Sequence, residues 1–150
     1  MSDVETRKSV WVIRKKPVLI VGAIVVIVFL GALAPLSIQL LHEMRIAHAQ
    51  FTTFGDALVA KDYERAWSLT SPEFQDAITK ADFIQQQKQL CLNLGALKAI
   101  FSKASEAEEN ENGVRSTIDA RFVFEKGERQ FQFVMKKNGT TWLVLGYEEL

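Results

Sequence analysis

The sequence predicts an α+β fold, in which helices pack on a curved four-stranded antiparallel sheet behind one N-terminal transmembrane helix. Two observations predict it. The twenty residues from Pro17 to Leu36 carry no charged or strongly polar side chain. After them, apolar residues recur with the period of a helix up to about residue 94, and with the two-residue period of a strand from about residue 97. Helices followed by antiparallel strands are typical of α+β domains.

The apolar run is long enough to cross a membrane. About 20 helical residues span the ~30 Å hydrocarbon core, and a helix satisfies its own backbone there. We therefore expect a transmembrane helix over residues 17–41. Five basic residues against two acidic ones precede it, so the positive-inside rule makes residues 1–16 a cytoplasmic basic tail. Residues 42–150 are then an extracytoplasmic domain.

A cleaved signal peptide is the alternative interpretation of this run. Ala32-Leu33-Ala34 and Ala47-His48-Ala49 have the small-x-small form of a cleavage site. Cleavage at the first would leave Pro35 at the new terminus, and the second lies beyond charged residues. The run also exceeds the roughly 7–15 apolar residues of a signal peptide. We favour an uncleaved anchor.

Charge and cysteine content narrow the class of domain. From His42 onward the chain has 16 acidic and 13 basic residues, so nothing indicates a nucleic-acid surface. Cys91 is the only cysteine, so the domain is held by core packing without an internal disulfide. Outside the cytoplasm this suits a bacterial envelope, and we expect the protein in the inner (cytoplasmic) membrane.

The first half of the domain reads as helical. Five apolar residues recur at spacings of three and four along one helix face, namely Met44, Ala47, Phe51, Phe54 and Leu58. Three helix starts follow: Asp62, Ser71 before Pro72, and Thr79. The last of these helices ends at Gly95.

The second half reads as four strands joined by three hairpins. We expect strands over 97–102, 114–124, 129–136 and 141–147, with glycine or asparagine in the turns. The acidic stretch from Glu106 to Glu111 is expected to be a flexible loop. In the second strand one face is apolar, and the other carries Arg115, Thr117, Asp119 and Arg121.

The pattern resembles the cystatin-like/NTF2-like superfamily, in particular small envelope-facing domains of unknown function that follow one membrane helix. The residues that carry the resemblance are Phe51-x-x-Phe54-x-x-Ala57-Leu58, Lys61 to Leu69, Ser71-Pro72-Glu73-Phe74, Phe83, Gly95 and Trp142-x-Val144-x-x-Tyr147. The resemblance covers about residues 45–150. It implies a curved sheet wrapped round a long helix as a cone with an apolar interior, and it implies no activity.

Such a cone offers a candidate ligand pocket. Its lining residues would be seven aromatics, namely Tyr63, Trp67, Phe74, Phe122, Phe131, Phe133 and Trp142. Binding pockets are mostly apolar with a few polar groups. The alternative, which we favour, is that these side chains fill the core, because a domain of this size without disulfides needs their burial.

No residue pattern indicates catalysis, a metal or a cofactor. Asp119 and Arg121 face away from Phe122, so they are expected in solvent or at an interface. His42 and His48 stand about 240° apart round a helix and cannot share a ligand. Cys91 lies on an apolar helix face, where a thiol acts as a small hydrophobe.

These observations favour a membrane-anchored, non-catalytic binding or protein-interaction module. Its partner is expected to be a second copy or another envelope protein, held through the exposed sheet face of the second strand. A tether raises the local concentration of such a domain near membrane partners. Two alternatives remain: an NTF2-like enzyme or carrier for a small apolar molecule, and an accessory subunit of a membrane complex.

Overall fold

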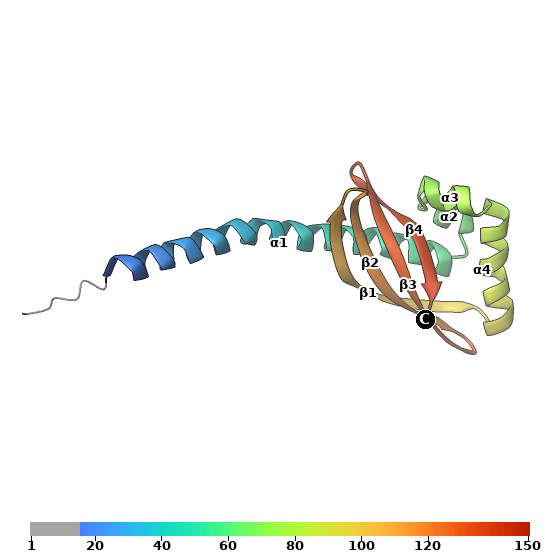
Figure 1. Ribbon diagram of the computed structural model, residues 1–150. Coiled ribbons are helices and arrows are strands. Elements are labelled where there is room, and N and C mark those ends of the chain that lie inside the picture. The colour runs from blue at the N-terminus through green and yellow to red at the C-terminus, as the bar shows by residue number, and fades with distance from the viewer. Residues whose placement is uncertain (1–15) are drawn as a thin grey trace, which may run out of the picture. The chain divides into compact units, whose positions relative to one another are not determined.

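Within residues 16–150, four helices precede four strands. The structure, a computed structural model, describes the backbone of residues 16–150 and the side chains of residues 38–150. Residues 38–150 form one compact unit. The elements are α1 (Lys16–Val59), α2 (Tyr63–Ser68), α3 (Pro72–Ala77), α4 (Lys80–Leu94), β1 (Leu97–Asn110), β2 (Gly113–Phe124), β3 (Gly127–Asn138) and β4 (Thr141–Glu149) (Figure 1).

The predicted α+β order is therefore confirmed. The predicted basic tail and the apolar run from Pro17 to Leu36 lie outside the residues whose side chains are described. Within residues 38–150, no helix combines the length and the apolar character needed to cross a membrane.

Each short helix begins at the predicted capping residue. The side chain of Asp62 accepts a hydrogen bond from the backbone N–H of Arg65 at 3.1 Å. Ser71 and Thr79 cap α3 and α4 in the same way, which satisfies N–H groups that have no partner inside the helix. Gly95 ends α4 with a φ of +82°, a conformation that side-chain-bearing residues rarely adopt.

The strands form one antiparallel sheet in the order β1-β2-β3-β4. The prediction of a flexible loop from Glu106 to Glu111 is wrong, because β1 continues to Asn110 and pairs with β2 along this stretch. Glu108 stands opposite Arg115 in the register, and opposite charges favour such a pair. The Asn110 side chain accepts from the N–H of Asn112 at 2.9 Å and shapes the turn.

The hydrophobic core lies between α1 and the inner face of the sheet. Phe51 and Phe54 on α1 are buried, and the Phe51 ring centroid lies 4.8 Å from that of Phe133 on β3. In β2 the predicted alternation is confirmed, since Ile118, Ala120, Phe122 and Phe124 are all buried. In Figure 1 the sheet passes over the C-terminal part of α1, and α2, α3 and α4 gather beyond β4.

Candidate functional site

Three of the predicted pocket residues, Phe122, Phe131 and Phe133, pack together on the inner face of the sheet. The rings of Phe122 and Phe131 lie 4.8 Å apart, and those of Phe122 and Phe133 are stacked at 5.8 Å. Tyr147 on β4 joins them, 5.1 Å from the Phe133 ring. Register explains the meeting, because Ala120 pairs with Phe131 and Ile118 with Phe133, which places alternate residues of β2 and β3 on one face.

The space that these rings leave is very small. The void between the inner sheet face and the helices has a volume of about 10 Å³, which is roughly the room for one water. Its polar lining consists of Gln87, which is buried on α4, and the hydroxyl of Tyr147, which accepts a hydrogen bond from Gln87 Nε2 at 3.5 Å. Burial raises the pKa of Tyr147. The aromatic side chains therefore fill the interior.

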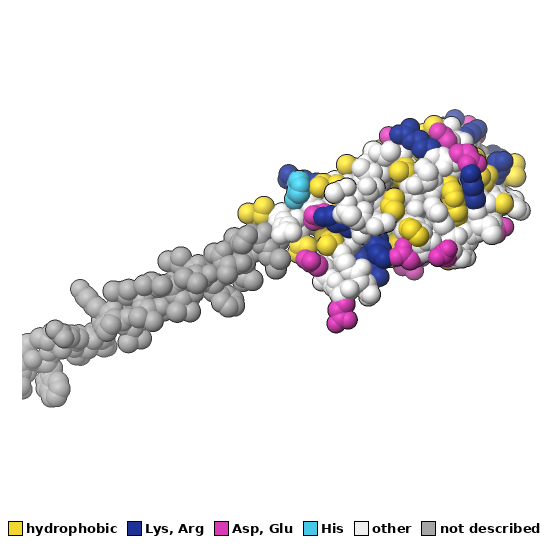
Figure 2. Space-filling model, turned by 90° about the horizontal axis from the view of Figure 1, so that it is seen from above, with side chains coloured by type: hydrophobic (Ala, Val, Ile, Leu, Met, Phe, Trp, Pro, Cys, Tyr) yellow, Lys and Arg dark blue, Asp and Glu magenta, His cyan; other side chains and the backbone are white. Residues whose placement is uncertain are grey.

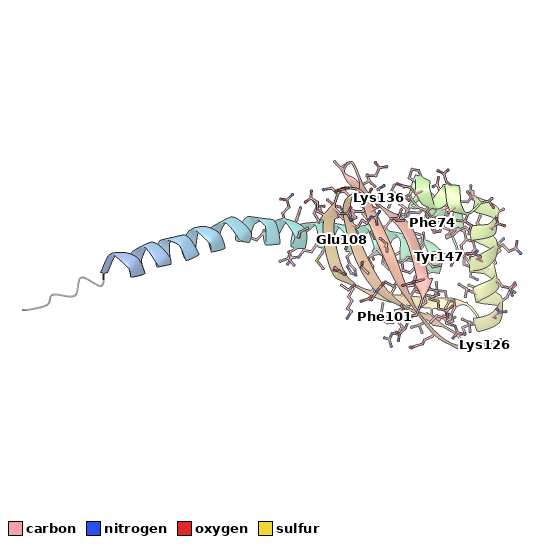
Figure 3. All side chains as sticks on the ribbon, viewed as in Figure 1. Phe74, Phe101, Glu108, Lys126, Lys136 and Tyr147 are labelled. Atoms are coloured by element: carbon pink, nitrogen blue, oxygen red, sulfur yellow. The ribbon has the colours of Figure 1, made fainter. Side chains whose placement is uncertain are left out.

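The other predicted pocket residues lie elsewhere. Trp67 and Phe74 pack on Phe83, with ring centroids 5.5 and 6.0 Å from it. Phe74 also lies 6.0 Å from Tyr147, so Tyr147 joins this second cluster to the first (Figure 3). Tyr63 is half-buried, and its pKa is raised by burial and by the adjacent Cys91 thiol. Trp142 is buried on β4 outside both clusters, with its Nε1 unpartnered.

The aromatic interior is separate from the acidic and imidazole side chains; His48 and Asp56, for example, line a partly open cavity of about 290 Å³ between α1 and β1. The void lining contains no carboxylate and no imidazole. The buried acid of residues 38–150 is Glu43, and its Oε1 accepts from Lys137 Nζ at 2.5 Å. Within the same range no three His, Cys, Asp or Glu side chains lie close enough together to hold a metal ion.

The outer face of the sheet, which turns away from α1, is left uncovered by the helices. Of the four side chains predicted to be exposed there, Arg121 is exposed, whereas Arg115, Thr117 and Asp119 are half-buried; all four alternate with the buried residues of β2. An open hollow of about 290 Å³ lies on this face, between β1 and the end of β4. Two exposed apolar side chains flank it, Phe101 at 56% exposure and Leu150 at 67%.

Polar contacts order the floor of the hollow. The Arg121 guanidinium lies over the Phe101 ring, 5.1 Å from its centroid, a cation–π arrangement. Gln132 Nε2 donates to Asp119 Oδ1 at 3.1 Å. The outer face therefore combines basic, acidic, amide and apolar side chains around the hollow and can accept a partner of mixed character. On the side of the domain that Figure 2 shows, these kinds of side chain are likewise interspersed, with no single sign of charge gathered together.

Both edges of the sheet are protected against another strand. On β1, Lys103 and two register shifts interrupt the edge, and His48 Nε2 donates to the carbonyl of Ser102 at 3.0 Å. On β4, the N–H of Ser71 donates to the carbonyl of Val144 at 2.8 Å. Proteins use such bulges, charges and coverings to prevent edge-to-edge pairing. The outer face is thus the more accessible surface of the sheet.

The sequence reasoning missed three residues of the hollow: Phe101, Gln130 and Leu150. The signal for Phe101 was present, because Ile100, Ser102 and Ala104 alternate with Phe101 and Lys103. Gln130 and Leu150 could be placed only once the register was known. The N–H of Leu150 donates to the carbonyl of Gln130 at 2.9 Å, which sets the end of the chain beside β3.

Comparisons with known proteins identify no family. No protein-family model matches the chain, and no curated protein is similar to it. Among solved structures it is similar to the crystal structure of a de novo designed protein with a curved β-sheet. The TM-score is 0.45 and the sequences are 13% identical, over 69% of this chain and 97% of that chain.

Proposed function

We propose that the protein is a membrane-anchored, non-catalytic interaction module that presents the outer face of its sheet to a partner. Residues 1–16 lie in the cytoplasm, residues 17–41 cross the inner membrane, and residues 42–150 form the extracytoplasmic domain. The protein makes no chemical change to its partner. It holds the partner at the membrane surface.

Two features support the anchor. The run from Pro17 to Leu36 is apolar throughout and its positive flank is N-terminal. The first described side chains continue this character, since Ile38 is 67% exposed and Leu41 is 57% exposed. Large apolar side chains on a helix surface directly after an apolar run suit the boundary between lipid and water.

The observation that carries the interaction role is the uncovered outer face with its hollow between Phe101 and Leu150. The small volume of the interior void also favours an interaction role over ligand binding. A void of about 10 Å³ is far below the roughly 300–1,000 Å³ of small-molecule pockets. A carrier or an enzyme of the NTF2-like kind would need a larger interior with a polar group at its base.

We also propose that the fold is of the cystatin-like/NTF2-like kind. The support is the order of elements, with a long helix packed along the inner face of a four-stranded meander and shorter helices at one end. The resemblance rests in part on Trp142, Val144 and Tyr147 of the last strand; the first two belong to the core and Tyr147 packs against it.

A topology experiment tests the anchor. A reporter enzyme that is active only outside the cytoplasm is fused after Leu150 and expressed in bacteria. We expect activity, and we expect the full chain to stay in the membrane fraction after alkaline washing. The control deletes residues 17–36, which should abolish both. Activity of a cytosolic reporter at the same position would overturn the proposed orientation.

Site-directed photocrosslinking tests the interface. A photoreactive residue is placed at Gln130 or Thr117 on the outer face, or at Gln89 on the exposed side of α4 as a control. In membranes we expect adducts from the outer-face positions and few from position 89. If the outer-face positions gave no adducts, or no more than the control, the interaction role would be contradicted.

A further inference from the structure

We propose that the partner on the outer face is a second copy of this chain, with the two sheets stacked about a two-fold axis parallel to the strands. This inference rests on the proposed function, because it requires the outer face to be an interface. It names the partner and the pairing of side chains.

The register aligns the outer-face side chains in rows across all four strands. We call the first the Phe101 row, which contains Phe101, Arg121, Gln130 and Leu150. The second, the Lys103 row, contains Lys103, Asp119, Gln132 and Glu148. A two-fold axis parallel to the strands places β1 over β4 of the other copy and β2 over its β3. Each row then meets the same row of the other copy.

The Phe101 row is complementary to itself under this axis. The exposed ring of Phe101 comes to lie over the exposed side chain of Leu150 of the other copy, and the contact repeats on the opposite side of the axis. Between them Arg121 faces the amide of Gln130. Both apolar side chains that flank the hollow would thereby leave water, which is the main favourable contribution to such an association.

The Lys103 row is complementary in charge. The ammonium of Lys103 faces the carboxylate of Glu148 of the other copy, twice per dimer. Asp119 faces Gln132, which already donates to Asp119 within one chain at 3.1 Å. Lys103 and Glu148 are both exposed and have no ion-pair partner among the described residues. Complementary charge of this kind sets the register of an interface.

The perpendicular two-fold axis fits less well. With the axis at Ile118 it would reverse the rows. Lys103 would then meet Glu106 of the other copy, but Arg121 would meet Arg115, and the exposed ring of Phe101 would meet the carboxylate of Glu108. The parallel axis also brings two basic side chains together, Arg115 and Lys136. Each of these has an acid beside it in its own chain, however, since Glu108 stands opposite Arg115 and Glu73 is paired with Lys136.

The expected association is weak in solution and stronger in the membrane. Four strands ~4.8 Å apart, with about ten residues each at ~3.3 Å per residue, present on the order of 500 Å² per copy. That is below the roughly 800 Å² per partner of a typical stable interface. Anchoring both copies in one membrane raises their effective concentration, so the experiment must use the full chain in membranes.

Chemical crosslinking of the full chain tests the pairing. Stacked sheets lie ~10 Å apart, too far for a disulfide, so a short bismaleimide is used in a Cys91→Ala background. Chains carrying Lys103→Cys and Glu148→Cys, with different tags, are co-expressed. We expect a crosslinked product that contains both tags. Lys103→Cys alone is the control, because its two copies would lie three strand spacings apart, and it should give little product.

Charge exchange provides the second readout. Dimer formation is measured by energy transfer between labelled chains in lipid vesicles. Lys103→Glu and Glu148→Lys should each weaken it by about two- to tenfold, and the two together in one chain should restore it. Lys88→Glu on the exposed side of α4 should leave it unchanged. Equal losses in the single and double variants would overturn the proposed pairing.

The photocrosslinks separate the two proposals. Adducts at Gln130 that contain only this chain, together with the crosslink between positions 103 and 148, support both. Adducts with a different protein and no product between positions 103 and 148 overturn the second-copy inference and leave the interaction role intact. No adducts at all would overturn both.

Discussion

The Nζ of Lys137 on β3 lies 2.5 Å from Oε1 of Glu43 on α1, an ion pair between residues 94 positions apart in the chain. The Glu43 side chain is only 10% exposed and that of Lys137 28%. The second carboxylate oxygen of Glu43 is buried without a hydrogen-bond partner. The pair therefore connects the helix that enters the domain to the end of β3, beside the β3–β4 hairpin.

The first prediction concerns this pair. Lys137→Met should lower the free energy of unfolding by about 1–3 kcal/mol, because it leaves a buried carboxylate without its cation. Glu43→Leu combined with Lys137→Met should recover most of the loss, because it removes both charges. Urea denaturation of the full chain in detergent micelles, followed by tryptophan fluorescence, measures both. If the double variant were as unstable as Lys137→Met, the loss of stability would not come from the unpaired carboxylate, and the prediction would be contradicted.

The aromatic interior should be essential for folding, and the outer-face aromatic should not. Phe133→Ala removes a buried ring that packs against Phe51 and Tyr147, and should cost about 3–5 kcal/mol. Phe101→Ala removes a ring that is largely exposed, and should change stability by about 0.5 kcal/mol or less. Thermal and urea unfolding compare them. If Phe101→Ala were equally destabilising, the exposed outer face would not be free for a partner.

The end of α4 should tolerate no side chain. A Cβ on Gly95 would lie 2.7 Å from the Cβ of Glu125, and the backbone φ of +82° is strained for other residues. Gly95→Ala should therefore cost about 1–3 kcal/mol. Gly127 is the matched control, since a Cβ there meets nothing within 4 Å, and Gly127→Ala should be close to neutral in the same unfolding measurement.

Acid should weaken the contact between α3 and the sheet. The hydrogen bond from Lys136 lowers the pKa of Glu73 to about 2, whereas an unfolded glutamate has a pKa of about 4.3. A carboxyl with a lowered folded pKa stabilises the protein above the unfolded pKa, and this stabilisation is lost as the pH falls from about 4 towards 2.

Glu73→Gln should therefore lower the unfolding temperature slightly at pH 6 and have no effect near pH 2. The effect is small because the Glu73 carboxyl is exposed to solvent. Lys136→Met should lower the unfolding temperature with the same dependence on pH. Glu73→Gln combined with Lys136→Met should lower it no further than either substitution alone. A Glu73 carboxyl that titrated near 4.3 by NMR in the folded protein would contradict this prediction.

Local signals predicted the helices well. Asp62, Ser71 and Thr79 each cap a helix through contacts within three residues, so nearby sequence contained the whole interaction. The same holds for Gly95, where the backbone conformation itself requires glycine. The alternation in β2 also predicted correctly which residues face the core.

Predictions that depended on another part of the chain were weaker. β1 was expected to end near Ser102, because a run rich in glutamate has low strand propensity. Pairing with β2 overrides that propensity and places Glu108 opposite Arg115. The candidate pocket also depended on contacts between distant residues. The sequence placed seven aromatics near the interior, but it did not show that Tyr147 and Phe54 complete the packing around a void of about 10 Å³.

The sequence by itself determined the order of helices and strands, the capping residues and the alternation of the strands, and it supplied the apolar run on which the predicted anchor depends. These properties arise from interactions between residues close together in the chain or from composition alone. The tertiary structure decided the length of β1, the filled interior, the ion pair between Glu43 and Lys137, and the rows across the outer face. All four depend on the register of strands and on contacts between distant residues, which local periodicity does not encode.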